Sequence, residues 1–214
     1  MHDLLGVNMP YGSKMSVASG AEWGLPGLLS AVSAHEDTFE AGRLFPPTVY
    51  QGLTLVYQLS GENTARIGGA DLVTRGGDLC LYARQTRIAW ERTARRGALR
   101  VHYLRMVGPL ADEVERVLAL HPIRPLILAD APRAWGFAVD RLTRLVFDRP
   151  AGWAWVFIAQ MGELVGEMVA FRAERHTPAA RWVERVRLLV EGSPRHDWSA
   201  KEIAQALGVC RDTL

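Results

Sequence analysis

Chemistry in this chain of 214 residues would depend on its few histidines and cysteines, and their spacing predicts no metal centre. The six histidines are spread over the whole sequence: His2, His35, His102, His121, His176 and His196. No two of them are adjacent or one residue apart, and the two cysteines, Cys80 and Cys210, form no CxxC motif. This spacing argues against a zinc site and against a disulfide framework. The sequence also has no phosphate-binding or nucleophile-elbow motif, so we expect no catalytic residue, no metal and no cofactor.

Aromatic and polar side chains on the predicted strands offer a better prospect of a binding site. A pocket for a small organic molecule needs apolar walls and a few well-placed polar groups. Four residues could supply them and are our candidate ligand-binding residues: Tyr57, Trp90, His102 and Tyr103. The alternative is that the three rings pack in the core and that His102 is solvated or paired.

The overall composition is that of a globular protein. Hydrophobic residues make up 49% of the chain and charged residues 22%, with a formal net charge of +2. These values exclude a disordered, collagen-like or coiled-coil chain. Residues 153–171 form an apolar stretch of membrane length, but they include Glu163 and Glu167, and a carboxylate near a bilayer centre is costly. No secretory signal is recognisable at the N-terminus, so we expect a cytoplasmic protein that does not enter a membrane.

Short apolar runs between turn residues predict a β domain over residues 29–130, preceded by an arm over residues 1–28. In the clearest run every second residue is large and apolar, which places one set on a single face of a strand: Leu53, Leu55, Tyr57 and Leu59. In the run over residues 99–106, the same alternation places His102 and Tyr103 on opposite faces.

Turn residues and a late strand complete the prediction for the β domain. Gly68-Gly69 predicts a hairpin because glycine accepts positive φ, and Asp78 after Gly76-Gly77 is expected to fix a turn. A helix over residues 110–120 and a further strand over 126–129 follow. Six or seven short strands of this kind indicate a sandwich, a jelly roll or a small barrel.

The stretch YQLSGENTARIGGADLVTRGGDLCLY, residues 57–82, resembles the cupin-like sensor domain of AraC-type transcription regulators. Three elements carry the resemblance: Leu59-Ser60-Gly61, Ile67-Gly68-Gly69 and Gly76-Gly77-Asp78. The resemblance implies a jelly-roll fold with a small-molecule effector. Metal-dependent cupins carry paired histidines, but here Arg84-Gln85-Thr86 stands where relatives often place a histidine. A metal-dependent enzyme is therefore not expected.

Two helices are predicted after the β domain, over residues 131–175. In the second of them, residues 153–171, Gly162 and Gly166 lie four residues apart. The pair resembles the dimerisation helices of the same family, which implies a homodimer formed through residues 134–172. The alternative is that these helices only cover an open face of the sheet, and both can be true.

The C-terminal sequence WSAKEIAQALGVCRDTL resembles the first helix-turn-helix of AraC-type regulators. Ser199 and Glu202 fit a capping box, in which each side chain bonds the backbone amide of the other residue. The resemblance implies four DNA-binding residues: Ser199, Arg211, Asp212 and Thr213. Cys210 departs from the family, which usually has Ser or Thr there. Because the sequence stops at Leu214, we expect a truncated unit whose DNA binding needs the missing C-terminal part; a plain helical hairpin is the alternative.

These observations lead to one hypothesis and one rival. The hypothesis is an α+β protein with a cupin-like jelly-roll β domain, a helical dimerisation segment and a truncated helix-turn-helix. The N-terminal arm covers residues 1–28 and the cupin-like sensor domain covers residues 29–130. The dimerisation segment covers residues 131–175, and the partial DNA-binding domain covers residues 179–214. Such a protein would be an effector-responsive, DNA-binding transcription regulator and not an enzyme. The rival is a metal-free cupin that binds or isomerises a small molecule.

Overall fold

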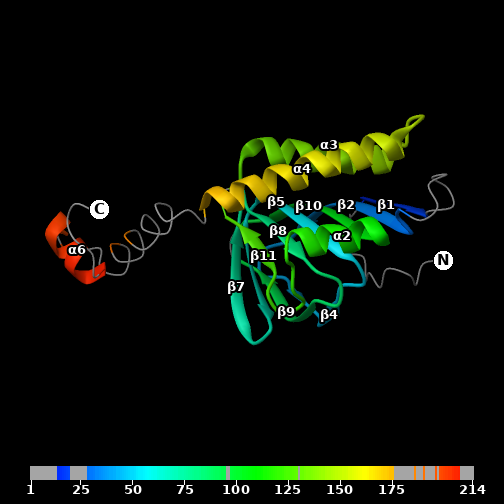
Figure 1. Ribbon diagram of the computed structural model, residues 1–214. Coiled ribbons are helices and arrows are strands. Elements are labelled where there is room, and N and C mark those ends of the chain that lie inside the picture. The colour runs from blue at the N-terminus through cyan, green and yellow to red at the C-terminus, as the bar shows by residue number, and fades with distance from the viewer. Residues whose placement is uncertain are drawn as a thin grey trace. The chain divides into compact units, whose positions relative to one another are not determined.

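Two antiparallel sheets form the β part of the computed structural model, which is an α+β fold (Figure 1). The structure describes residues 14–19, 28–94, 97–129, 131–175, 186, 190, 196 and 198–207. The chain divides into two compact units, Met1–Val165 and Gly166–Leu214, which are described separately. The six-stranded sheet has the order β1-β2-β10-β5-β8-β11. Its strands are β1 (Lys14–Ser19), β2 (Ala31–Phe39), β10 (Leu99–Val107), β5 (Leu53–Ser60), β8 (Leu79–Tyr82) and β11 (Leu126–Leu128).

The second, five-stranded sheet has the order β3-β9-β6-β7, with β4 also paired to β9. Its strands are β3 (Leu44–Phe45), β9 (Arg87–Thr93), β6 (Glu62–Ile67), β7 (Ala70–Arg75) and β4 (Thr48–Val49). A cluster of buried apolar side chains draws on both sheets, including Phe39, Val56, Ile67, Ile88 and Val101. The two sheets therefore enclose a common core, as the cupin-like jelly-roll prediction requires.

Strand β5 is buried on both of its faces. Leu53, Leu55 and Tyr57 share one face, as the alternation predicted, and all three are buried. Val56 and Gln58 point the other way and are buried as well. Leu59, the fourth residue of the predicted face, lies near the end of β5 and is 40% exposed.

The predicted turns of the β domain are confirmed. Gly68 connects β6 to β7 with a φ of 58°, and a Cβ at this position would lie 2.6 Å from the Ile123 carbonyl oxygen. Glycine is therefore required there for both its conformation and its size. In the next turn the Arg75 amide donates to Asp78 Oδ2 over 2.7 Å, which gives Asp78 the turn-fixing role expected of it.

Helix α3 (Arg133–Asp148) packs on the six-stranded sheet, against β1, β2, β5 and β10, on the face turned away from the other sheet (Figure 1). Its close approach depends on Gly136, because a Cβ there would lie 2.5 Å from the Tyr57 ring. Helix α2 (Pro109–Val117) contacts β10 and β5. Both helices cover a sheet face that would otherwise expose large apolar side chains.

Part of the predicted N-terminal arm belongs to the sheet. Strand β1 pairs with β2 along its whole length, from Lys14 opposite Glu36 to Ser19 opposite Ala31. The Ser16 hydroxyl also donates to the Val146 carbonyl over 2.9 Å, which ties the edge strand to α3.

Helix α4 (Trp153–Arg175) has two different faces. One face is buried and carries Phe157, Met161, Leu164 and Met168. The opposite face is exposed and mostly small; we call it the α4 stripe, and it consists of Trp155, Ala159, Gly162, Gly166, Val169 and Ala173. Over Trp153–Ala173 the helix is long and apolar enough to cross a membrane, and 33% of this apolar stretch is buried within the protein.

In the C-terminal unit, helix α6 (Ala200–Leu207) begins with the predicted capping box. The Ser199 amide donates to Glu202 Oε2 over 2.9 Å, and the Glu202 amide donates to the Ser199 hydroxyl over 3.3 Å. The capping box of α6 is thus confirmed. The predicted DNA-binding residues Arg211, Asp212 and Thr213 lie outside the described residues.

Candidate ligand-binding cavity

A cavity of about 660 Å³ lies between the two sheets. The six-stranded sheet forms one wall in rows, because residues paired across antiparallel strands project to the same side. Two of these rows, read from β2 across β10 to β5, are Asp37–Val101–Gln58 and His35–Tyr103–Val56. Arg105, two residues beyond Tyr103 on β10, also lines the cavity.

The five-stranded sheet and the segment over residues 45–51 form the rest of the wall. Gln58 joins the two sheets: its Nε2 donates to the Thr74 carbonyl over 3.2 Å, and the Thr74 hydroxyl donates to Gln58 Oε1 over 2.8 Å. Asn63 on β6 donates to the Glu91 carboxyl on β9. These contacts hold four polar side chains in fixed positions around the cavity, which is the condition for recognising a specific ligand.

Three tyrosines give the cavity an aromatic side. The hydroxyls of Tyr50 and Tyr103 are hydrogen-bonded to each other, and the Tyr50 and Tyr82 rings are 5.1 Å apart between centroids. Burial raises the pKa of all three phenols above the ordinary value for tyrosine. Their hydroxyls therefore remain protonated and can both donate and accept hydrogen bonds.

Charged groups of both signs lie in the cavity wall. The Arg105 guanidinium sits 5.2 Å from the centroid of the Tyr50 ring, and its Nε donates to the Thr54 hydroxyl over 3.4 Å. Asp37 supplies a carboxylate. Burial raises the pKa of Glu91, and the hydrogen bond from Asn63 offsets part of this rise. The wall thus combines a fixed cation with two carboxyl groups in different environments.

His35 is a neutral imidazole at neutral pH. Burial, and secondly the positive charge of Arg105, lowers its pKa from 6.5 to about 4. Its ring meets the Tyr103 ring edge-on with centroids 6.2 Å apart. A neutral imidazole has one donor and one acceptor nitrogen, so His35 adds a versatile polar group to the cavity.

The structure separates the four residues that the sequence suggested as ligand contacts. Tyr103 lines the cavity. Tyr57 and His102 lie on the opposite face of the six-stranded sheet, toward α3, because they occupy alternate positions to the cavity-facing residues of β5 and β10. Trp90 is paired in register with Arg66 of β6 and lies 5.7 Å from its guanidinium, among residues that do not line the cavity.

Several lining residues were missed by sequence reasoning. Arg105 could have been found, because it follows Tyr103 by two residues on the same strand and must share its face. His35, Asp37 and Glu91 gave no signal, since their strands showed no clear alternation of polar and apolar residues. Among the described residues, one group of three His, Cys, Asp or Glu side chains is close enough to hold a metal ion, and it lies outside the cavity.

Comparison with known proteins gives similarities in structure only. No protein-family model and no curated protein matches the sequence. Among solved structures, an apo form of ToxT from Vibrio cholerae is 9% identical over 86% of this chain and 72% of that chain, with a TM-score of 0.47. ToxT with a bound unsaturated fatty acid is 8% identical over 86% and 71% of the two chains, with a TM-score of 0.45.

The cupin domain of Cnp3 from Schizosaccharomyces pombe is also similar, at 13% identity over 54% of this chain and 77% of that chain, with a TM-score of 0.37. ToxT is a regulator of the AraC family.

Proposed function

We propose that this protein is an effector-responsive transcription regulator of the AraC type, whose effector binds in the cavity between the two sheets. The observation that carries this proposal is the cavity itself: its volume of about 660 Å³ lies in the range typical of small-molecule sites. Its polar side chains are held in place by neighbours, as Gln58 is by Thr74. A preformed site of this kind loses little entropy when it binds.

The charges of the wall favour a small polar organic molecule over a simple anion. The cation of Arg105 is accompanied by the carboxylate of Asp37, while His35 stays neutral at neutral pH. A ligand with hydroxyl, carbonyl or zwitterionic groups could pair with both signs. Its body would lie against the rings of Tyr50 and Tyr103.

We propose a homodimer through residues 134–172, with the α4 stripe at its centre. Trp155 is 61% exposed and Val169 is 40% exposed, although both are large and apolar. Between them a Cβ on Gly162 or Gly166 would meet nothing within 4 Å. An exposed apolar helix face with small residues in the middle suits the close approach of a second copy of the same helix.

In the proposed mechanism, the effector acts through β10. This strand carries Tyr103 and Arg105 on the cavity side and His102 on the side of α3. A movement of β10 caused by the bound effector would therefore also move the side chains that contact α3. Such a shift would bias the geometry of the dimer and the spacing of its DNA-binding domains. Residues 179–214 would supply part of each DNA-binding domain, with Ser199, Arg211, Asp212 and Thr213 at the DNA. We also propose that the chain is divided into the four segments predicted from the sequence, and that the protein is cytoplasmic.

The DNA-binding part is tested by electrophoretic mobility shift on the upstream region of the gene. The 214-residue chain is compared with a longer chain that carries two complete helix-turn-helix units. The longer chain should bind specifically and much more tightly, because its two complete units supply more contacts to the DNA. In the longer chain Arg211→Ala should cost roughly 1–3 kcal/mol of binding free energy. If the longer chain does not bind this DNA specifically, the proposal that the protein is a transcription regulator is wrong. If both chains bind equally well, the recognition helix has been assigned to the wrong residues.

The effector part is tested by thermal-shift screening of small polar metabolites against the full chain. For a compound that binds, Val101→Trp should abolish binding by filling the cavity. Tyr103→Phe should weaken binding roughly two- to tenfold, the usual worth of one hydrogen bond. Trp90→Phe is the matched control, because Trp90 lies outside the cavity. A compound whose affinity is unchanged by Val101→Trp binds elsewhere.

A second candidate function is a metal-free cupin that isomerises a small molecule. The specific observation in its favour is the presence of two groups in one cavity that can exchange protons: the imidazole of His35 and the carboxyl of Glu91, whose pKa burial raises. A base and an acid of this kind could move a proton between two carbons. Incubation of each binding compound with the protein, followed by NMR, separates the two functions: a regulator returns its effector unchanged, and an isomerase does not.

A further inference from the structure

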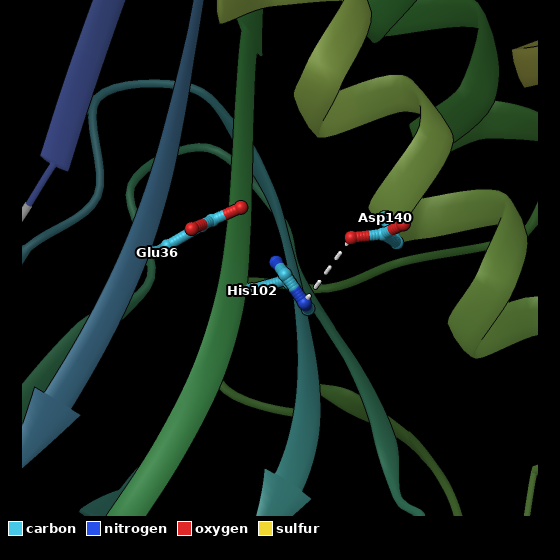
Figure 2. A group of neighbouring side chains, drawn as sticks. All are labelled: Glu36, His102 and Asp140. Atoms are coloured by element: carbon cyan, nitrogen blue, oxygen red, sulfur yellow. Dashed lines mark ion pairs between the residues drawn. The ribbon is translucent and has the colours of Figure 1, made fainter.

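Three side chains that could bind a metal ion meet outside the cavity, on the face of the six-stranded sheet that α3 covers (Figure 2). Glu36 on β2 and His102 on β10 are direct partners in the strand register, and Asp140 projects from α3. One ligand atom from each residue lies within 4.8 Å of the other two. The group therefore joins three elements that are far apart in the sequence.

His102 is the centre of this group. Its side chain is 9% exposed, its Nε2 lies 3.7 Å from Asp140 Oδ1, and its buried Nδ1 has no hydrogen-bond partner in the structure. Buried polar atoms are almost always hydrogen-bonded, so an imidazole placed like this points to a missing partner. Figure 2 shows the ring between the two carboxylates, with one nitrogen toward Asp140 and the other on the side of Glu36.

The surroundings hold the group in a form suited to a cation. Arg144 Nε lies 3.1 Å from Asp140 Oδ2, which orients this carboxylate so that its other oxygen faces His102. Burial lowers the pKa of His102, and the nearby carboxylates of Asp140 and Glu36 partly oppose this shift. Asp140 is 26% exposed, which leaves room for water on the ion.

We propose that Glu36, His102 and Asp140 bind one divalent first-row transition-metal ion such as Zn²⁺, which clips α3 to strands β2 and β10. One imidazole and two carboxylates form a mixed nitrogen and oxygen donor set that suits such ions better than Mg²⁺ or Ca²⁺. Bonds of about 2.0–2.2 Å in a tetrahedral site place two ligand atoms on one ion about 3.4 Å apart. The ligand atoms of the group lie within 4.8 Å of one another, so binding draws them together by up to about 1.4 Å, a movement that the half-buried Glu36 side chain can make. The site is on the opposite face of β10 from the effector cavity and does not depend on the proposed regulator function.

The first test uses the full chain, stripped of metal by a chelator and titrated with ZnCl₂ in calorimetry and thermal unfolding. We expect one equivalent of zinc to bind to the group. At a free zinc concentration of 100 times the Kd, Tm should rise by roughly 5 to 10 °C, because only the folded state presents the three ligands together. The same concentration of Mg²⁺ should leave Tm unchanged. No zinc-dependent rise in Tm would overturn the proposal.

Variants then show whether the zinc binds at this place. Glu36→Gln and Asp140→Asn each remove one ligand charge with little change of shape, and each should weaken zinc binding at least about tenfold. His121→Gln removes an exposed histidine outside the group and is the matched control, with wild-type zinc affinity expected. The far-UV circular dichroism of each metal-free variant checks that it folds. Wild-type affinity in both ligand variants, or loss of binding in the His121 control, would show that zinc binds elsewhere and overturn the site.

Discussion

His35 and His102 lie on opposite faces of the same sheet, and their surroundings give them different roles. His35 contributes to the cavity beside Tyr103, whereas His102 faces α3 beside Asp140. Burial lowers the pKa of both imidazoles; at His35 the charge of Arg105 adds to this shift, whereas at His102 the carboxylates of Asp140 and Glu36 partly oppose it. Each buried imidazole makes the free energy of unfolding depend on pH, since the unfolded chain protonates it more readily.

The first prediction concerns this pH dependence. The pKa of His35 is about 4 in the folded protein and 6.5 as the ordinary value, so the unfolded chain binds more protons between these limits. The stabilisation is complete above pH 6.5 and is lost as the pH falls toward 4. Between pH 7 and pH 4.5 the wild type should lose about 2–3 kcal/mol of unfolding free energy through this residue, and His35→Gln should not.

Urea unfolding of both proteins at the two pH values measures this difference. His102 acts in the same direction as His35, and the raised pKa of Glu91 acts in the opposite direction, but both groups are present in the two proteins and cancel in the comparison. His121→Gln, at an exposed histidine, is the control and should keep the wild-type dependence on pH. Equal losses in wild type and His35→Gln would contradict a low pKa for His35.

Strands and turns were predictable from the sequence because their rules are local. The alternation over β5 correctly placed Tyr57 on the same face as Leu55, and Gly68 correctly marked a hairpin. The same rule could not say which of the two faces of a strand lines the cavity, because both are buried. Tyr57 therefore lies under α3 rather than in the cavity, a result that depends on where the helix packs. The group formed by Glu36, His102 and Asp140 was hidden for the same reason, since it needs the register of β2 against β10 and the position of α3.

The second prediction concerns the packing of α3 on the sheet. Gly136→Ala should lower the free energy of unfolding by about 1–2 kcal/mol, because the new Cβ would lie 2.5 Å from the Tyr57 ring. The loss should appear although alanine is intrinsically better than glycine in a helix by up to about 1 kcal/mol. Gly162→Ala is the matched control: a Cβ there meets nothing within 4 Å, so it should leave stability unchanged or raise it.

Denaturant unfolding at low protein concentration compares these variants. If the clash with Tyr57 is the cause, the double variant Tyr57→Leu with Gly136→Ala should lose less stability than the sum of its two single changes. Strict additivity would show that the cost of Gly136→Ala arises from another contact.

At the scale of the whole molecule, the exposed face of α4 is the surface through which we expect two chains to associate. The sequence shows an apolar stretch but cannot distinguish its faces by composition, since both faces carry apolar residues. The structure separates a buried face, with Phe157 and Met161, from the exposed α4 stripe, with Gly162 and Gly166. The burial of the first face explains why the helix is apolar, and the exposure of the second leaves an apolar surface that nothing in the described part of the chain covers.

The third prediction tests the dimer at the α4 stripe. Gly166→Leu should raise the dissociation constant of the homodimer at least about tenfold, because a large side chain keeps the two helix backbones apart. The fold of the single chain should not suffer, since the space around Gly166 is open for 4 Å and leucine is a better helix former than glycine. Size-exclusion chromatography with light scattering over a dilution series measures the constant. Glu163→Leu adds the same side chain at an exposed position beside the stripe and should leave the constant within about threefold of the wild type. A wild-type chain that remains monomeric at ~10 µM and above, or a Gly166→Leu chain that dimerises as tightly as the wild type, would place the interface elsewhere or remove it.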